Sequence, residues 1–312
     1  MALRTTDALL DKIKRKSFMP TAQPTFTDEE LLEIATEELH GVIVPSITNT
    51  REEYYVYKDS RYALNGQQNQ TFNIPHRAVG MQLREISATI GGQEINMPRY
   101  DIEDRIYENG GGNVFGFDLT NNQINVRGSG SGTMNIYYYL RPGDLVKSNQ
   151  ARQIQVIDAV NKQLTVASPP STWSTATKFD VIRSVAGYGH KSIDLTINNI
   201  DSATGLITFD ADFPADGWQA FEVGDWLAVA EQSPVPQIPL EWQEYLAESV
   251  VCYIMSSIGD AEGFNRASAR KEELKKLALD TISARVDGQS RKIVPRRNRG
   301  AYMFDTWRNR SW

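Results

Sequence analysis

Apolar residues recur at helical spacing near both ends of the chain and at alternating positions between them. Near the start, Thr27 and Glu30 form a capping-box pair that precedes one apolar stripe, made of Leu31, Ala35, Leu39 and Val42. We expect a helix from Thr27 that Pro45 ends or kinks. A shorter amphipathic helix is expected over residues 6–16, and one or two helical turns over residues 50–57.

Helical spacing returns after three prolines at residues 234–239. One stripe consists of Trp242, Leu246, Ser249, Val250 and Tyr253. A turn is expected over residues 259–263, followed by a helix over residues 265–286 that Gly288 ends. The second stripe consists of Leu274, Leu277, Ala278, Thr281 and Ile282. The mixed charges of residues 270–276 indicate that the other face of this last helix is solvated.

Between about residues 70 and 235 the pattern changes to short alternating runs separated by turn signals. The expected strands are residues 135–140, 154–157, 163–166, 178–182, 192–197, 205–209 and 226–230. Strands at this spacing without a helical period predict an all-β sandwich or barrel.

Part of this β region is similar to itself. Residues 156–166, VIDAVNKQLTV, resemble residues 199–209, NIDSATGLITF, and a proline, a tryptophan and a phenylalanine follow each copy. Two copies are too few for a solenoid, so we expect two similar hairpins in one barrel. Trp173 and Trp218 stand at matched positions, and large aromatic side chains at such positions favour core anchors over an exposed carbohydrate platform.

The helices at the two ends each carry an apolar stripe that needs a partner. We therefore expect an α+β fold: a helical bundle of the N- and C-terminal helices, a large inserted all-β domain (barrel or sandwich) and an extended C-terminal arm. The predicted boundaries are 1–25 for an N-terminal arm or linker, 26–72 plus 236–288 for the discontinuous bundle, 73–235 for the β domain and 289–312 for the arm.

Charge separates the arm from the rest of the chain. Residues 291–312 contain seven basic residues and one acid, Asp305, which gives +6, whereas the whole chain is −6 and residues 1–290 are therefore −12. The arm also carries Tyr302, Phe304, Trp307 and Trp312, without a helical or strand period. Because large aromatic side chains are costly to leave in water, we expect the arm to bind a partner surface.

Motifs for catalysis or metal binding are weak. The three histidines, His40, His76 and His190, are not at metal-ligand spacing, and a single cysteine excludes a zinc pattern. Residues 187–192, GYGHKS, miss the phosphate-loop pattern, and GSGSG at 128–132 is typical of a turn. We expect the acidic residues at 101–104 to form a solvated turn and Cys252 to be a buried, inert thiol. No enzyme activity, cofactor or metal is expected.

Composition places the chain among soluble globular proteins, with 23% charged and 40% hydrophobic residues. One cysteine fits a reducing compartment. We expect no signal peptide and no membrane anchor, because the most apolar helical run, residues 250–258, is far shorter than the ~20 residues that span a bilayer.

Two strings resemble the head-to-tail adaptor (connector) proteins of tailed bacteriophages: NIPHRAVGMQLREI at residues 73–86 and YYYLRPGDLV at residues 137–146. Residues 26–57 are similar to the first helical hairpin of those adaptors, with an acidic N-cap, a leucine-rich helix, a proline and REEYYV. The resemblance extends over residues 26–146 and, more loosely, the two late helices. The large β insertion departs from the family pattern.

The resemblance implies a structural virion protein at the head–tail interface, made in the host cytoplasm. It implies a helical bundle, a homo-oligomeric ring of about twelve copies under the portal protein, and double-stranded DNA passing through the ring without sequence-specific binding. Tail, nozzle or tail-fibre proteins are the other expected partners. We expect the arm to bind the portal through Arg296, Arg297, Tyr302, Phe304, Trp307, Arg308, Arg310 and Trp312.

Two other classes remain open from the sequence. A β-rich tail or receptor/glycan-binding module would expose Trp173 and Trp218, and a nucleic-acid-binding protein would use the basic, aromatic arm. The acidic body opposes the second reading, because it repels a phosphate backbone.

Overall fold

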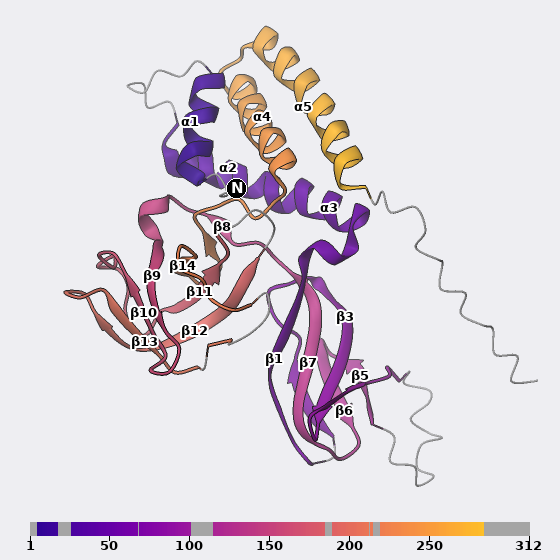
Figure 1. Ribbon diagram of the computed structural model, residues 1–312. Helices are drawn as coiled ribbons and strands as arrows, with labels where there is room; N and C mark the ends of the chain where they lie inside the picture. Colours follow the sequence, from indigo (N-terminus) through magenta and orange to yellow (C-terminus); the bar gives the residue numbers. More distant parts are fainter. Residues whose placement is uncertain are drawn as a thin grey trace, which may run out of the picture. The chain divides into compact units, whose positions relative to one another are not determined.

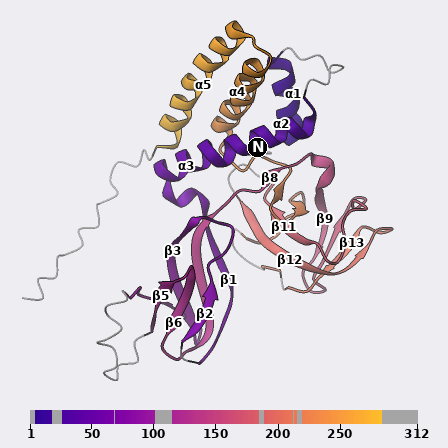
Figure 2. The same ribbon diagram turned by 180° about the vertical axis from the view of Figure 1, so that it is seen from behind.

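The computed structural model describes residues 5–17, 26–67, 69–100, 115–184, 189–211, 213–214 and 219–283. These residues form an α+β fold, with helices at both ends of the described chain and strands between them (Figure 1; Figure 2 gives the opposite view). The expected α+β class is confirmed, and the strand-rich part includes a closed six-stranded barrel. The predicted arm, residues 289–312, lies outside the described residues.

The helical elements are α1 (Thr6–Lys16), α2 (Asp28–Glu38), a π-helical turn η1 (Leu39–Ile43), α3 (Val44–Thr50), a 3-10 turn η2 (Glu52–Tyr55), α4 (Leu240–Ser257) and α5 (Ala261–Ile282). Of these, α1 and α2 start where the sequence pattern predicts. The capping box is confirmed: the Glu30 N–H donates to Thr27 Oγ1 at 3.2 Å, and the Thr27 N–H donates to Glu30 Oε2 at 2.7 Å.

Pro45 does not end the first long helix, because a π-helical turn precedes it. The Val44 N–H donates to the Leu39 carbonyl five residues back, and α3 then continues to Thr50 with the proline in its first turn, where a missing N–H costs little. The wider turn also shifts the apolar stripe. Ile43 is fully buried in the position that the helical period predicted for Val42.

Side chains from all five α-helices share one hydrophobic core. Its members include Ile13, Leu31, Ile47, Trp242, Leu246, Leu274 and Ala278. Lysines of α1 extend this contact at the surface, where Lys16 pairs with Glu248 of α4 at 2.5 Å and Lys14 pairs with Asp28 of α2 at 2.5 Å. The N-terminal and C-terminal helices thus bury their apolar stripes against each other.

The prediction is wrong for parts of the apolar stripes of the two C-terminal helices. Tyr253 is 51% exposed and Leu277 is 53% exposed, and Thr281 is exposed as well. The buried face of α5 is narrower than predicted because Leu274, Ala278 and Ile282 follow each other every four residues, which leaves the neighbouring positions outward. The helix also starts earlier, since Asp260 caps it by accepting from the Gly263 N–H at 2.9 Å.

Two sheets in the first half of the β region share a second core. The four-stranded sheet has the order β1 (Val56–Asn65), β7 (Ser131–Leu140), β3 (Ala78–Ile90), β4 (Gln93–Asn96). The three-stranded sheet has the order β2 (Gln70–Asn73), β6 (Gln123–Arg127), β5 (Gly116–Thr120). A two-stranded parallel pair joins β8 (Asp144–Leu145) and β15 (Gln232–Ser233).

Strand β1 corrects the predicted boundary between helices and strands. The sequence assigned residues 26–72 to the helical bundle, but the chain becomes extended at Val56 and pairs with β7 from Val56↔Tyr139 onwards. Charged residues at 58, 59 and 61 hide the alternation in this strand, because Asp59 is buried although it is an acid. At the other boundary, α4 begins at Leu240, close to the predicted residue 236.

The barrel contains both predicted hairpins. Its strand order is β10 (Gln163–Val166), β13 (Leu206–Phe209), β12 (His190–Asp201), β11 (Lys178–Ile182), β14 (Trp226–Val229), β9 (Arg152–Asp158). The 3-10 turn η4 (Ser148–Gln150) precedes β9. The two similar segments form hairpins β9–β10 and β12–β13, and β10 pairs with β13, so the copies lie side by side in one barrel as predicted.

Trp173 confirms its predicted place in the core. It is 7% exposed and packs edge-to-face on Phe179, with ring centroids 4.8 Å apart. Trp218, its predicted counterpart, lies outside the described residues. No helix within the described ranges has the length and apolar character needed to cross a membrane.

Candidate functional site

The residues predicted to bind a partner lie outside the part of the chain that the structure describes. This applies to Arg296, Arg297, Tyr302, Phe304, Trp307, Arg308, Arg310 and Trp312, and also to the acidic residues at 101–104. Their roles stay predictions. The structure describes both strings that carry the adaptor resemblance, and it brings parts of them together.

The two strings lie next to each other in the four-stranded sheet. Residues 78–86 of the first string lie in β3, and residues 137–140 of the second lie in β7. These strands pair antiparallel with Ile86 opposite Ile136 and Ala78 opposite Leu140. The backbone contact continues past the strands, where the Arg141 N–H donates to the Arg77 carbonyl at 2.9 Å. Segments distant in sequence therefore form one unit, which we call the strand pair.

The loop that follows β7 ties the strand pair to the helices. Its Pro142 carbonyl lies 3.1 Å from His40 Nε2, within the π-helical turn. The Leu145 N–H donates to Thr36 Oγ1 of α2 at 3.0 Å, and the Val146 carbonyl accepts from Thr6 Oγ1 of α1 at 2.6 Å. The RPGDLV part of the second string is thus used for internal contacts with two helices.

Gln237 connects the same loop to the segment that leads into α4. Its side-chain oxygen accepts from the Gly143 N–H at 2.7 Å, and its backbone carbonyl accepts from the Tyr55 hydroxyl at 3.4 Å. The residue is 1% exposed. Buried polar contacts of this kind fix one arrangement of the backbone, because an unpaired group there is costly.

A buried ion pair ties the strand pair to the barrel. Arg77 Nη1 lies 2.7 Å from Asp180 Oδ2 of β11, and the two side chains are 4% and 0% exposed. Asp180 also accepts from the backbone N–H groups of Asp194 and Glu231, at 2.9 and 3.1 Å. Burial raises the pKa of the Asp180 carboxyl, while Arg77 and these donors oppose the rise.

His190 lies against this ion pair. Its Nδ1 is 3.6 Å from Asp180 Oδ2, and the ring is fully buried. Burial lowers the pKa of His190 well below its usual range, and the charge of Arg77 lowers it further, while a hydrogen bond with Gln237 opposes the shift. A neutral ring next to a charged pair is a structural arrangement that acid would disturb.

Within the described part of the GYGHKS string, residues 189–192, the lysine is buried and paired with acids. Lys191 is 1% exposed, and its Nζ lies 2.7 Å from Asp225 and 3.4 Å from Glu222. The ammonium is therefore neutralised inside the barrel region. The sequence reasoning that discarded this motif gave no role to Lys191, and the structure assigns it a buried ion pair.

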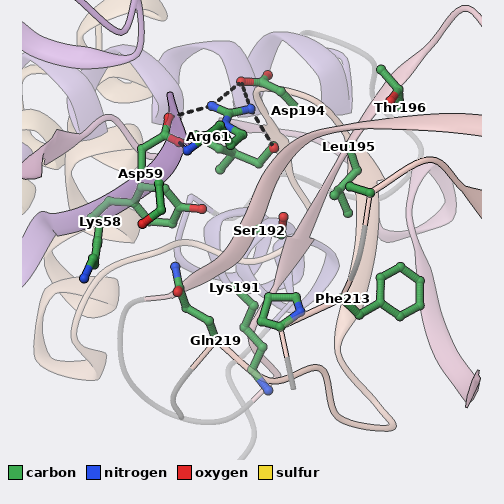
Figure 3. Close-up of a pocket in the computed structure, with 15 residues that line it drawn as sticks. Lys58, Asp59, Arg61, Lys191, Ser192, Asp194, Leu195, Thr196, Phe213 and Gln219 are labelled. Atoms are coloured by element: carbon green, nitrogen blue, oxygen red, sulfur yellow. Dashed lines mark hydrogen bonds and ion pairs between the residues drawn. The ribbon is translucent and has the colours of Figure 1, made fainter. Parts of the chain in front are cut away.

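An open pocket of ≈ 420 Å³ lies between β1 and β12 (Figure 3). One end carries Arg61, which pairs with Asp59 at 2.7 Å on its own strand and with Asp194 at 3.5 Å on β12. The walls are residues 57–61 and 191–196, with Ala211, Phe213, Pro214 and Gln219 alongside. In Figure 3 the Arg61 ion pairs close this end, and Ser192 lies on the β12 side.

Sequence reasoning missed the charged residues of this region, although one signal was available. Asp180 interrupts an apolar strand, Phe179–Ile182, and a carboxylate inside such a run needs a buried partner. The partner itself, Arg77, could not be identified, because many arginines were candidates.

The ion pairs and hydrogen bonds described above connect one part of the chain to another. Across the described ranges, no group of three or more histidine, cysteine or acidic side chains is placed to hold a metal ion. Cys252 is half-buried instead of fully buried, because it packs at the edge of the helical core; desolvation raises the pKa of its thiol.

No protein-family model matches the sequence, and no curated protein matches it either.

Proposed function

We propose that this protein is a ring-forming head-to-tail adaptor of a tailed bacteriophage. It joins the portal protein to the tail and lines the channel through which DNA leaves the capsid. Its work is mechanical and needs no catalysis. It acts in the virion, at the neck.

One observation carries the proposal. Parts of the two strings that resemble the adaptor family lie side by side in the paired strands β3 and β7. Other residues of the strings contact α1, α2, the segment before α4 and the barrel. Residues used in this way determine how the parts of the chain are connected. A resemblance concentrated at such a joint favours a shared architecture over a chance match of a surface motif.

The helices support the same reading. Their common core is what a helical bundle with an inserted β region requires, and among the described residues the bundle then consists of residues 6–16 and 26–55 together with 236–282. The candidate contacts of the β region are the tail, nozzle or tail-fibre proteins and a neighbouring adaptor.

The charge distribution suits a DNA channel. The body of residues 1–290 carries −12, so it repels the duplex and lets DNA slide without sticking. The basic arm has the opposite sign and anchors each copy on the portal through its arginines and aromatic side chains. With about twelve copies in the ring, modest single contacts become strong through avidity.

A truncation tests the arm. Protein ending at Gly288 should stay folded and soluble but should no longer assemble on portals, so that filled capsids leak DNA or lack tails. Trp307→Ala should weaken docking more than Arg299→Ala, since removing a buried aromatic anchor typically costs ~2 kcal/mol or more and removing a rim charge costs little. Normal portal occupancy by the truncated protein would reject the anchoring role.

A further inference from the structure

An open groove of ≈ 410 Å³ lies between helix α2 and the segment of residues 144–150 that includes β8. Every residue that lines it belongs to the described chain. Leu32 and Leu145, which are 3% and 5% exposed, supply its buried apolar lining. The hydrogen bond from the Leu145 N–H to Thr36 Oγ1 joins the two walls. The groove is therefore formed by elements that are held in contact with each other.

The side chains that line this groove are mostly acidic. They include four carboxylates and one cation, a net formal charge of −3: Glu29, Glu33, Glu37 and Asp144 against Lys147. Lys147 is already paired, with Glu29 at 2.9 Å and with Asp28 of the same helix at 3.1 Å. No ion pair joins Glu33 or Glu37 to another residue of the described chain. Two carboxylates of the groove are thus left without a cation of the described chain.

His40 does not cancel the charge of Asp144 on the opposite wall. Its Nδ1 lies 3.8 Å from Asp144 Oδ1, but burial lowers the pKa of the ring, which is therefore neutral at pH 7. Arg141 lines a neighbouring pocket together with Asp144, and no ion pair joins the two. Asp144 is exposed and adds its charge to the groove.

The glutamates at positions 29, 33 and 37 follow each other every four residues, and we call them the α2 stripe. Like charges at this spacing repel each other and work against the helix, so a bound cation is favoured. Among the described residues, no three acidic, cysteine or histidine side chains are placed to hold a metal ion. The cations that suit the groove are therefore side chains of a protein. Lysine and arginine also carry aliphatic stems that can cover the apolar lining while their charged ends reach the carboxylates.

The spacing of the α2 stripe sets the spacing of its ligand. Successive glutamates of the stripe are separated by about 6 Å along the helix axis, at about 1.5 Å per residue. Alternate residues of an extended chain are about 6.6–6.8 Å apart. Basic residues at alternate positions of an extended segment therefore match the stripe.

We propose that this groove binds an extended segment of a partner protein that carries lysine or arginine at alternate positions. The basic side chains pair with the α2 stripe and with Asp144, and their stems cover Leu32 and Leu145. The inference does not depend on the adaptor assignment, because it concerns the lining of one groove.

The first test measures binding of a fluorescent peptide, acetyl-Thr-Lys-Thr-Lys-Thr-Lys-Thr-amide, to the full-length protein by fluorescence anisotropy at low salt. Glu33→Gln/Glu37→Gln should weaken binding about fivefold, the effect of losing two exposed ion pairs. Glu262→Gln/Glu272→Gln removes the same charge from exposed positions of α5 and should leave binding unchanged. A peptide with its three lysines adjacent should bind more weakly. No binding at millimolar peptide, or equal weakening by the two double variants, would overturn the proposal.

Carbodiimide coupling locates the bound peptide without a substitution. The reagent joins a lysine amine to a carboxylate in contact with it, and mass spectrometry identifies the coupled residues. The peptide should couple to Glu33, Glu37 or Asp144. Peptide coupled only to acids elsewhere would contradict the site. Coupling of Lys292, from the predicted arm, to these carboxylates without peptide would identify the arm as the occupant and contradict a partner segment.

Discussion

Arg77 and Asp180 form a buried ion pair of 2.7 Å that joins the turn before β3 to barrel strand β11. Removing one partner leaves an uncompensated buried charge, which typically costs 3–5 kcal/mol. Arg77→Ala should therefore lower the free energy of unfolding by about 3–5 kcal/mol in urea denaturation. Arg141→Ala, which changes an exposed arginine in the neighbouring loop after β7, should change it by less than about 0.5 kcal/mol.

The double variant Arg77→Met/Asp180→Leu should recover most of the lost stability, because apolar side chains can replace a buried pair at little cost. An Arg77→Ala protein within about 1 kcal/mol of the unmodified protein would show that the pair does not hold the joint.

The buried, neutral ring of His190 should make the free energy of unfolding depend on pH, and the direction follows from its lowered pKa. Its folded pKa is lowered, whereas the unfolded ring titrates near about 6.5, so the unfolded chain binds more protons below that pH. The stability that the neutral ring contributes is present above about pH 6.5 and is lost as the pH falls. Asp180, with its raised pKa, acts in the opposite sense.

Comparison with His190→Gln isolates the histidine. Between about pH 6.5 and 5, the free energy of unfolding of the unmodified protein should fall more steeply than that of the variant. The slopes come from urea denaturation at several pH values. Parallel curves would mean that His190 titrates alike in the folded and unfolded states.

Replacing Trp173 by a small residue should leave a cavity in the barrel core. Trp173→Ala should cost about 3–5 kcal/mol, because it removes a large buried side chain that packs on Phe179. Val160→Ala, at a position 90% exposed on the β9–β10 turn, should change stability by less than about 0.5 kcal/mol. A loss under about 1 kcal/mol for Trp173→Ala, together with lost glycan binding, would favour a carbohydrate-binding module.

A side chain added at Gly205 should clash with the neighbouring strand, and Gly91 serves as a matched control without such a clash. It has φ +72°, and an added Cβ would lie 2.0 Å from the Val166 carbonyl oxygen of β10. Gly91 has φ +59° with no atom within 4 Å of such a Cβ. Gly91→Ala should therefore cost about 1–2 kcal/mol from backbone strain, and Gly205→Ala clearly more. Equal losses in thermal unfolding would contradict the close contact.

Local signals in the sequence were sufficient for the barrel strands and for helices α1, α2 and α4, but not for strands β1–β6, β8 and β15, which were not among the expected strands. The capping box at Thr27 and Glu30, helix α1 and the barrel strands all depend on residues within a few positions of one another. The two similar hairpins could be predicted for the same reason, since each copy specifies its own turn. Strand β1 was missed because its alternation includes Asp59, a buried acid whose partner Arg61 lies on the same irregular strand.

The joint and the pocket could not be predicted, because they depend on pairs that are distant in the chain. Nothing in the sequence near Arg77 identifies Asp180, and nothing near Arg61 identifies Asp194. The π-helical turn before Pro45 was also not visible, because a helical period cannot show where one extra residue enters a turn. Such features can be identified only once the three-dimensional structure is known.

The most direct test of the adaptor assignment is the particle mass of the purified protein with and without its portal protein. The chain has a mass of 35.1 kDa. We predict a monomer alone and, on the portal, an added mass of about twelve such chains, as expected when single weak contacts become strong in a closed ring. A stable trimer without portal, or no mass added to the portal at saturating protein, would contradict the account.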